Sequence, residues 1–357
     1  MTEKRSPLFW LVILVCLGLA AYVYRSSREA ANSTNGPDVS LRPRLALIVG
    51  GSDDFWKQVI VGAKVATKEY DAELEVIEPD GTGAGQTEAL VKIHPQDYDG
   101  LAISPLAPNS QTLIISKLAT QMKVVTYDND ATNSLRHLYV GTNNVLAGQM
   151  AADLVARALP KGGQIALFVG DNERQNARDR RQAMINALRS QAYRGPSLES
   201  EEADKLAEPI EAGTFTIVAT YLDQSDPQQA LENAKQALQD NPNIAGMVAL
   251  YGYNGPACLA ALRDADKLEV VKLIAFDNHE ATLAGVADGL IEGTVVQDPY
   301  RYGYESVDSL CKLCRGKPAS IPVPGAGSIA LACAVVDQEN LAQYRENLSQ
   351  RMETISP

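Results

Sequence analysis

Short runs of apolar, often β-branched residues alternate along this chain with longer segments in which apolar residues recur every three or four positions. The first pattern is typical of buried strands and the second of helices packed on a sheet. In the amino-terminal part, strands are predicted at residues 44–50, 73–77, 100–104 and 123–127, and helices at 55–70, 87–93 and 110–121. This alternation predicts a parallel sheet with helices on both faces.

The same alternation begins again after a strand predicted at residues 138–141. Strands are predicted at 164–169, 217–222, 245–250, 270–276 and 293–297, and helices at 145–159, 178–191, 227–240, 256–265 and 302–315. The predicted fold class is therefore α/β, with two Rossmann-like, doubly wound units one after the other. The charged segment 193–214 is predicted to be a surface insertion outside either sheet.

Three of these strands run directly into hydrogen-bonding side chains. The residues are Asp128 and Asn129 after the strand at 123–127, Asp277 after 270–276, and Gln297 at the end of 293–297. Ligands of open α/β sheets bind beyond the carboxyl ends of the strands, where loops from several strands converge. We therefore expect these side chains to face a cleft.

The amino terminus departs from this plan, because residues 8–24 form an unbroken apolar run. The apolar part of a secretory signal usually spans about 7–15 residues, whereas a membrane-spanning helix needs about 17–25. The length favours a retained anchor, while the alanine pairs at 20–21 and 30–31 offer cleavage sites. We expect residues 1–26 to be a signal or membrane anchor and residues 27–43 to be a flexible tether.

The composition describes an ordinary globular protein of 357 residues, enough for two domains. Its formal net charge is −12 and no long Lys/Arg run occurs, which disfavours a nucleic acid as partner. Cys311 and Cys314 have the spacing of a redox pair or half a zinc site, but neither a second such pair nor a nearby histidine completes it. We expect a structural or disulfide role for this pair, core positions for Cys258 and Cys333, no metal and no cofactor.

Sequence signatures of catalysis are missing. The three histidines are far apart, and neither a GxSxG nucleophile motif nor a Walker loop occurs. The glycines at 81, 83 and 85 follow the second strand without GxGxxG spacing, so a plain turn is the better interpretation. Asp128 and Asp130 are near enough in sequence for acid–base chemistry, but the sequence supplies neither a nucleophile nor a metal to complete it.

The residues at the strand ends suit a small polyol. Sugar hydroxyls both donate and accept hydrogen bonds, so carboxylates, carboxamides and a planar guanidinium are natural partners. Sugar rings pack their apolar faces on aromatic side chains, which Phe55 and Trp56 supply at the first strand-to-helix junction. At the corresponding junction of the second unit, Arg178 is placed to hold two hydroxyls, while Arg180 and Arg181 are expected on the surface. The alternatives are interior packing for the two aromatics and a helix-surface ion pair for Arg178.

Taken in order, these motifs resemble those of the ribose/galactose-type periplasmic sugar-binding proteins of ABC transporters. The matching segments are LALIV (45–49), DFW (54–56), VVTYDND (124–130), YVGTNN (139–144), NARDR (176–180), IAFD (274–277) and GTVVQ (293–297). The resemblance implies two lobes, joined by three chain crossings, that close on one sugar without chemistry. It implies a first lobe of residues 44–142 with 298–323 and a second of 143–297 with 324–357.

The resemblance also implies which residues contact the ligand. The positions that match the family are the paired aromatics Phe55 and Trp56, the strand-end acid Asp128, the hydroxyl-binding arginine Arg178, and the hinge-side contacts Asp277 and Gln297.

Three further ligand-binding positions depart from the family pattern. Asp53 replaces the Asn of ribose binders, Asn129 replaces an Arg, and Tyr251 replaces a usual Asn. An additional aromatic and one fewer arginine indicate a larger or less hydroxyl-dense ligand.

The resemblance therefore implies an exported, non-enzymatic solute-binding protein in the periplasm or another extracytoplasmic space. Its ligand is expected to be a sugar, its partner an ABC permease, and its N-terminal segment a membrane tether. One alternative is a sensor that reports a sugar to a kinase or chemoreceptor; another is a sugar-modifying enzyme that uses Asp128 and Asp130 as acid and base. Repressors of the lactose-repressor type share this fold but begin with a helix-turn-helix, where this chain has an apolar run.

Overall fold

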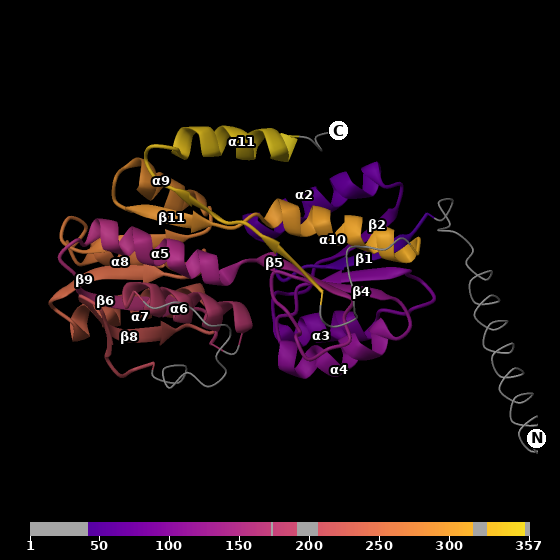
Figure 1. Ribbon diagram of the computed structural model, residues 1–357, viewed down its shortest axis with the longest axis horizontal. Helices are drawn as coiled ribbons and strands as arrows, with labels where there is room; N and C mark the ends of the chain where they lie inside the picture. The colour runs from indigo at the N-terminus through magenta and orange to yellow at the C-terminus, as the bar shows by residue number, and fades with distance from the viewer. Residues whose placement is uncertain (1–41, 173, 191–205, 317–326, 354–357) are drawn as a thin grey trace, which may run out of the picture.

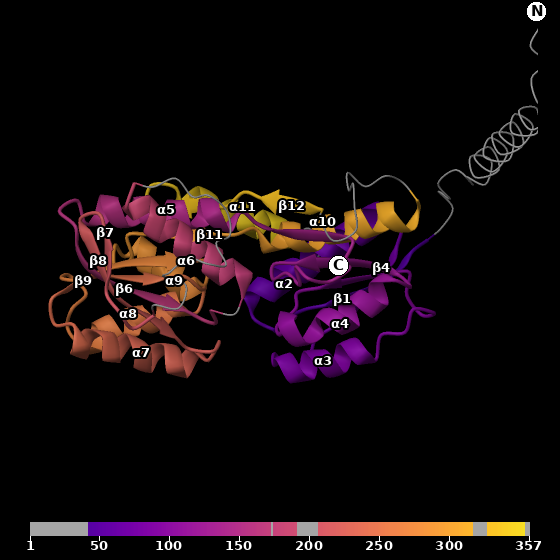
Figure 2. The same cartoon turned by 60° about the horizontal axis from the view of Figure 1, so that its bottom comes forward.

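Two α/β lobes lie side by side in the computed structural model, which describes residues 42–172, 174–190, 206–316 and 327–353 (Figures 1 and 2). The first lobe contains β1 (Arg44–Ile48), α2 (Asp54–Glu69), β2 (Glu73–Ile77), α3 (Gly83–Val91), β3 (Gly100–Ile103), α4 (Pro108–Ala119), β4 (Lys123–Tyr127), β5 (Leu138–Thr142), α10 (Pro299–Cys314) and β12 (Ser328–Leu331). The second contains α5 (Asn144–Ala158), β6 (Gly163–Val169), α6 (Gln175–Leu188), β7 (Ile210–Ala212), β8 (Phe215–Leu222), α7 (Pro227–Asp240), β9 (Ile244–Ala249), α8 (Asn254–Asp264), β10 (Lys272–Phe276), α9 (Glu280–Ala287), β11 (Gly293–Val296), β13 (Ala334–Val336) and α11 (Leu341–Glu353).

Each lobe is built on one sheet covered by helices on both faces. The first sheet has six parallel strands in the order β12-β5-β4-β3-β1-β2, with α2 and α10 on one face and α3 and α4 on the other. The second has seven strands in the order β13-β11-β10-β9-β6-β8-β7, with α5 and α6 on one face and α7, α8 and α9 on the other. Strands covered on both faces need apolar side chains at every position, which explains their continuous apolar runs. The predicted α/β class with two doubly wound units is confirmed.

Close helix packing fixes α10 in the first lobe, although α10 follows directly after β11 of the second. A Cβ atom at Gly62 of α2 would clash with the carbonyl oxygen of Tyr300, and one at Gly303 of α10 with the carbonyl oxygen of Val59. Only glycine allows the two backbones this approach. The start of α10 therefore has a fixed position beside the junction of the lobes.

The chain crosses between the lobes three times, from β5 to α5, from β11 to α10 and from β12 to β13. Because β12 pairs in parallel with β5, the third crossing falls after Leu331, later than the boundary at residue 323 that the sequence suggests. β12 is a short edge strand with mostly accessible side chains, so no apolar run marks it in the sequence. Similarly, Ile210–Ala212 forms β7 and pairs antiparallel with β8, so the end of the segment predicted as an insertion belongs to the second sheet.

Two further predictions concern the termini and the cysteines. The predicted anchor at residues 1–26 and the tether up to residue 41 lie outside the described residues. Within the described ranges, no helix is both long and apolar enough to cross a membrane. Cys258 and Cys333 are buried, as predicted, and Cys311 and Cys314 are free thiols, which leaves the structural role for that pair and not the disulfide.

Candidate ligand-binding site

A cavity of about 460 Å³ lies between the two lobes. Its lining includes every site residue predicted from the sequence except Arg178: Asp53, Phe55, Trp56, Asp128, Asn129, Tyr251, Asp277 and Gln297. The first five come from the first lobe, Tyr251 and Asp277 from the second, and Gln297 from the second crossing. Residues far apart in the sequence thus meet at the carboxyl ends of both sheets, as the strand-end argument predicts.

The two acids of the cavity are positioned by the same backbone arrangement. Asp128 follows β4 with φ +58° and Asp277 follows β10 with φ +59°, a left-handed conformation that Asp tolerates better than most residues. Each backbone N–H donates to the neighbouring strand at 2.9 Å, to Val140 and Val295 respectively. The backbone carbonyl oxygen of Asp128 accepts from the hydroxyl of Tyr139, and that of Asp277 from the hydroxyl of Thr294, both at 2.7 Å. Four bonds therefore hold the two turns that end these strands.

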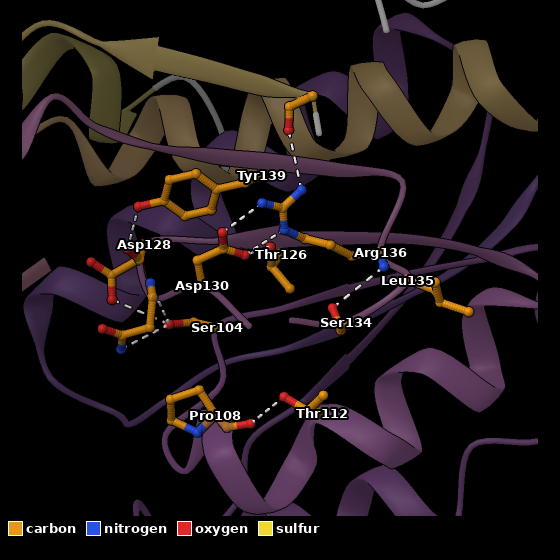
Figure 3. A network of polar contacts seen from close by, with 12 residues as sticks. Ser104, Pro108, Thr112, Thr126, Asp128, Asp130, Ser134, Leu135, Arg136 and Tyr139 are labelled. Atoms are coloured by element: carbon orange, nitrogen blue, oxygen red, sulfur yellow. Dashed lines mark hydrogen bonds and ion pairs between the residues drawn. The ribbon is translucent and has the colours of Figure 1, made fainter. Parts of the chain in front are cut away.

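Asp128 is buried, and its carboxylate has one neutral partner in the described structure, the hydroxyl of Ser104 at 3.2 Å (Figure 3). Burial raises the pKa of Asp128 to about 6, although the nearby charge of Arg180 opposes that rise. Burial also raises the pKa of Asp277, again against the effect of Arg180. Both carboxylates thus need hydrogen-bond donors to remain ionised in a closed cavity.

Asp130 serves a different purpose from Asp128, as Figure 3 shows. Its carboxylate accepts from the guanidinium of Arg136 at 2.6 Å and from the hydroxyl of Thr126 at 2.6 Å, and Arg136 donates further to the carbonyl oxygen of Gly327. Asp130 is absent from the cavity lining. The pair Asp128/Asp130 is therefore not arranged as acid and base on one ligand; Asp130 instead anchors the chain that leads into β12.

Arg180 supplies a buried cation to the cavity, with an exposure of only 2%. Its guanidinium donates to the side-chain oxygens of Asn144 at 2.9 Å and Gln297 at 3.2 Å, and its central carbon lies 4.4 Å from the centroid of the Phe276 ring. Asn144 follows the first crossing and Gln297 precedes the second. The arginine that faces Asp128 and Asp277 is thus attached to two of the three chain crossings.

This placement corrects the arginine chosen from the sequence. Arg178 donates to the carbonyl oxygen of Asn172 at 2.9 Å and to the side chain of Gln175 at 2.9 Å, outside the cavity lining. Successive helical residues are rotated by about 100°, so positions two apart lie on nearly opposite faces of α6. Arg180 occupies the inward face, and Arg181, 2% exposed, is also buried instead of lying on the surface.

Aromatic side chains rim the cavity from both lobes. Phe55 and Trp56 pack edge to face, with ring centroids 5.0 Å apart, and Asp53 accepts from the backbone N–H groups of both residues as the N-cap of α2. Opposite them, the ring centroid of Tyr251 lies 5.6 Å from the guanidinium carbon of Arg180. The hydroxyl of Tyr251 is buried without a hydrogen-bond partner in the described structure. A polar group of a ligand can satisfy it.

Asn129 connects the two lobes directly. Its side-chain oxygen accepts from the side-chain nitrogen of Asn176 on α6 at 2.8 Å, and its side-chain nitrogen lies 3.4 Å from the hydroxyl of Ser104. Asn129 therefore participates in closing the cavity, a role for which the sequence gives no signal.

Among the lining residues that the sequence analysis did not select are Arg174, Asn176, Arg180, Tyr253 and Asn278. Asn176 and Arg180 belong to the NARDR motif, and Asn278 directly follows Asp277. A rule that takes every polar residue at a strand-to-helix junction finds these three. Nothing in the sequence marks Tyr253, whose hydroxyl donates to buried Asp223 at 2.6 Å.

Two α/β lobes, three crossings and a polar cavity with an aromatic rim define a two-lobe ligand-binding protein. The chain belongs to the periplasmic binding protein family: the model of the periplasmic binding protein domain matches residues 45–318. The ribose import binding protein RbsB of Salmonella typhimurium is 21% identical over 301 residues, 84% of this chain and 94% of that protein.

Solved structures with the same fold cover nearly all of the two lobes. An ABC transporter solute-binding protein from Burkholderia graminis, in complex with D-arabinose, has a TM-score of 0.73 and 25% identity over 85% of this chain and 97% of that one. GanP, a glucose-galactose binding protein from Geobacillus stearothermophilus, has a TM-score of 0.73 and 24% identity over 84% of this chain and 99% of that one.

Proposed function

We propose that this chain captures a monosaccharide or a related polyol in the cavity between its lobes and delivers it to an ABC permease. The observation that carries the proposal is that Arg180 and two carboxylates from opposite lobes, Asp128 and Asp277, line one cavity. Such a set offers fixed donors and acceptors to neighbouring hydroxyls, while Phe55 and Trp56 offer an apolar surface to the ring. The sugar-binding relatives support this ligand class.

Closure follows from the same groups. When the lobes separate, Asp128 regains water; when they close, it is buried with Ser104 as its neutral partner and needs further donors. Hydroxyls of a bound sugar provide such donors, so the ligand binds the closed form better than the open form and shifts the population toward closure. Arg180 links this event to Asn144 and Gln297 at the crossings.

The test is direct identification of the ligand. Native mass spectrometry of the purified protein, followed by titration calorimetry with a panel of pentoses, hexoses and polyols, should yield a bound sugar that is released unchanged. Recovery of an altered sugar would support the enzymatic alternative, and binding of no member of the panel would contradict the ligand class.

We also propose that residues 8–24 hold the protein at the outer face of the cytoplasmic membrane. The support is the apolar run itself. Cell fractionation compares the intact chain with a variant that starts at residue 27 and is exported by a cleavable signal. The intact chain should be recovered with the membranes, and the variant should be recovered in the soluble fraction. Equal recovery of both in the soluble fraction would contradict the tether.

A further inference from the structure

The C-terminal helix α11 extends from the second lobe to the first. It follows β13 of the second sheet, and Leu341 and Tyr344 pack against a hydrophobic core of the second lobe. Near its other end, the guanidinium of Arg351 lies 3.0 Å from the carboxylate of Asp298 and 5.7 Å from the centroid of the Tyr300 ring. Both partners belong to the start of α10 in the first lobe, and Figure 1 shows α11 above the junction between the lobes.

A second connection starts from the middle of the same helix. The hydroxyl oxygen of Tyr344 accepts from the side-chain nitrogen of Asn278 at 2.9 Å. Asn278 also forms a reciprocal pair of amide contacts, 3.3 and 3.4 Å, with Gln58 of α2 in the first lobe. Gln58 is buried, and Asn278 lines the cavity directly after Asp277. Through Asn278, which lines the cavity, Tyr344 of α11 is therefore connected to Gln58 of the first lobe.

We propose that α11 is a latch, in which Tyr344 and Arg351 are positioning residues that stabilise the closed arrangement of the lobes and slow ligand release. The inference rests on the proposed function for its ligand. Contacts between lobes exist only when the lobes are together, so their free energy adds to the closed form alone. The match to the periplasmic binding protein domain ends at residue 318, before β12, β13 and α11.

The experiment compares three substitutions in the full-length chain. Arg351→Gln removes a connection between lobes, Tyr344→Phe removes the hydrogen bond that positions Asn278 for its contact with Gln58, and Arg345→Gln is the matched control. Arg345 lies on the same helix but pairs with Glu280 at 2.7 Å, inside the second lobe. A melting curve for each variant checks that the fold is intact.

Distances between the lobes provide a readout that needs no ligand. Spin labels on Leu113→Cys and Val270→Cys, which replace side chains 81% and 68% exposed in opposite lobes, report the distribution of separations. We expect Arg351→Gln and Tyr344→Phe to shift this distribution away from that of the wild type, and Arg345→Gln to leave it unchanged. Identical distributions for all three variants and the wild type would overturn the latch.

The dissociation rate of the tightest-binding sugar of the panel provides the second readout. Arg351 is about half exposed, so its loss should raise the rate by only ~1.5- to 5-fold, while the association rate stays the same. Unchanged rates would also contradict the latch. If no sugar of the panel binds, the proposed ligand class is wrong. The distance measurement still decides whether α11 stabilises the closed arrangement of the lobes.

Discussion

The ends of β4 and β10 share one backbone arrangement and differ in what surrounds their acids. Both acids occupy a left-handed turn, Asp128 with φ +58° and Asp277 with φ +59°. Asp277 accepts from the side chain of Gln297 at 2.9 Å and shares its lobe with Arg180, whereas Asp128 accepts from the neutral hydroxyl of Ser104 and lies across the cleft from Arg180. Charge compensation of Asp277 is therefore internal to one lobe, while that of Asp128 depends on closure. We therefore expect the acid of the first lobe to respond to closure, and Arg180 and Asp277 of the second lobe to form a fixed receptor.

The third residue after each strand shows the largest contrast. Asp130, after β4, forms a buried ion pair with Arg136, with side-chain exposures of 8% and 6%. The corresponding residue after β10 is exposed His279, whose ring accepts from the backbone N–H of Ala281 and caps α9. Asp130→Asn should lower the free energy of unfolding by about 3 kcal/mol, because it leaves the charge of Arg136 buried without a counter-ion. His279→Ala should cost about 1 kcal/mol, as the loss of a helix cap does.

Urea unfolding measures both variants. Equal losses of unfolding free energy in the two variants would mean that Asp130 and His279 stabilise their strand ends to the same extent, which would contradict the contrast between them. Sugar binding by folded Asp130→Asn should remain close to that of the wild type, because Asp130 does not line the cavity.

The receptor role of the second lobe is tested at Arg180. Arg180→Gln should weaken sugar binding about 100-fold, because it removes the cation whose charge favours the ionised forms of Asp128 and Asp277. Arg178→Gln, two positions earlier on α6, is the control and should change the affinity less than about 3-fold. Titration calorimetry measures the affinity of both variants, and melting curves confirm that they are folded. A larger loss of affinity for Arg178→Gln than for Arg180→Gln would support Arg178 as the ligand-binding arginine, as predicted from the sequence.

The same residues show which features of the site could be predicted from the sequence and which could not. The strand ends could be predicted because an apolar run that stops at Asp128 or Asp277 is typical of a buried strand that ends there. The choice between Arg178 and Arg180 could not be predicted. Both are arginines of one helix, and only the packing of α6 against its sheet decides which of them faces inward. β12 and α11 escaped prediction for a related reason: their side chains are mostly accessible, so neither carries a strong apolar pattern. Contacts between lobes, such as Asn129 with Asn176, depend on how two separately folded units meet.

The sensing role of Asp128 gives a pH dependence with a definite sign. With the lobes together, as in this structure, burial raises the pKa of Asp128 to about 6, whereas its ordinary pKa is 3.8. Between these values the folded state binds more protons than the unfolded state, so the contribution of Asp128 to stability is present below about pH 4 and declines as pH rises to about 6. Asp128→Asn should remove this decline and raise the Tm of the ligand-free protein at pH 7 by roughly 3 °C relative to the wild type.

Melting curves at pH 4, 5, 6 and 7 for the wild type and Asp128→Asn are the measurement. Parallel curves for the two proteins would show that Asp128 titrates normally. Asp277→Asn should change stability in the same direction, since burial raises that pKa as well. Both variants should bind sugar more weakly, because a carboxamide is a poorer acceptor for a hydroxyl than a carboxylate.

The smallest expected effect concerns Asn129, the residue that follows Asp128, and its partner Asn176 across the cleft. Their side chains are 2.8 Å apart, so each is available either to the other lobe or to the ligand. If the contact between lobes is the main role of Asn129, then Asn129→Ala and Asn176→Ala should each weaken sugar binding only ~2- to 5-fold, and the double variant should lose no more than either single one. If Asn129 holds the ligand directly, Asn129→Ala should cost clearly more than Asn176→Ala and the two losses should add. The corresponding residue after β10 is Asn278, which already pairs with Gln58 of the opposite lobe. A non-additive result at Asn129 would therefore show that the two strand ends are alike at a second residue. At each strand end, an acid would face the cavity and the amide residue after it would connect the lobes.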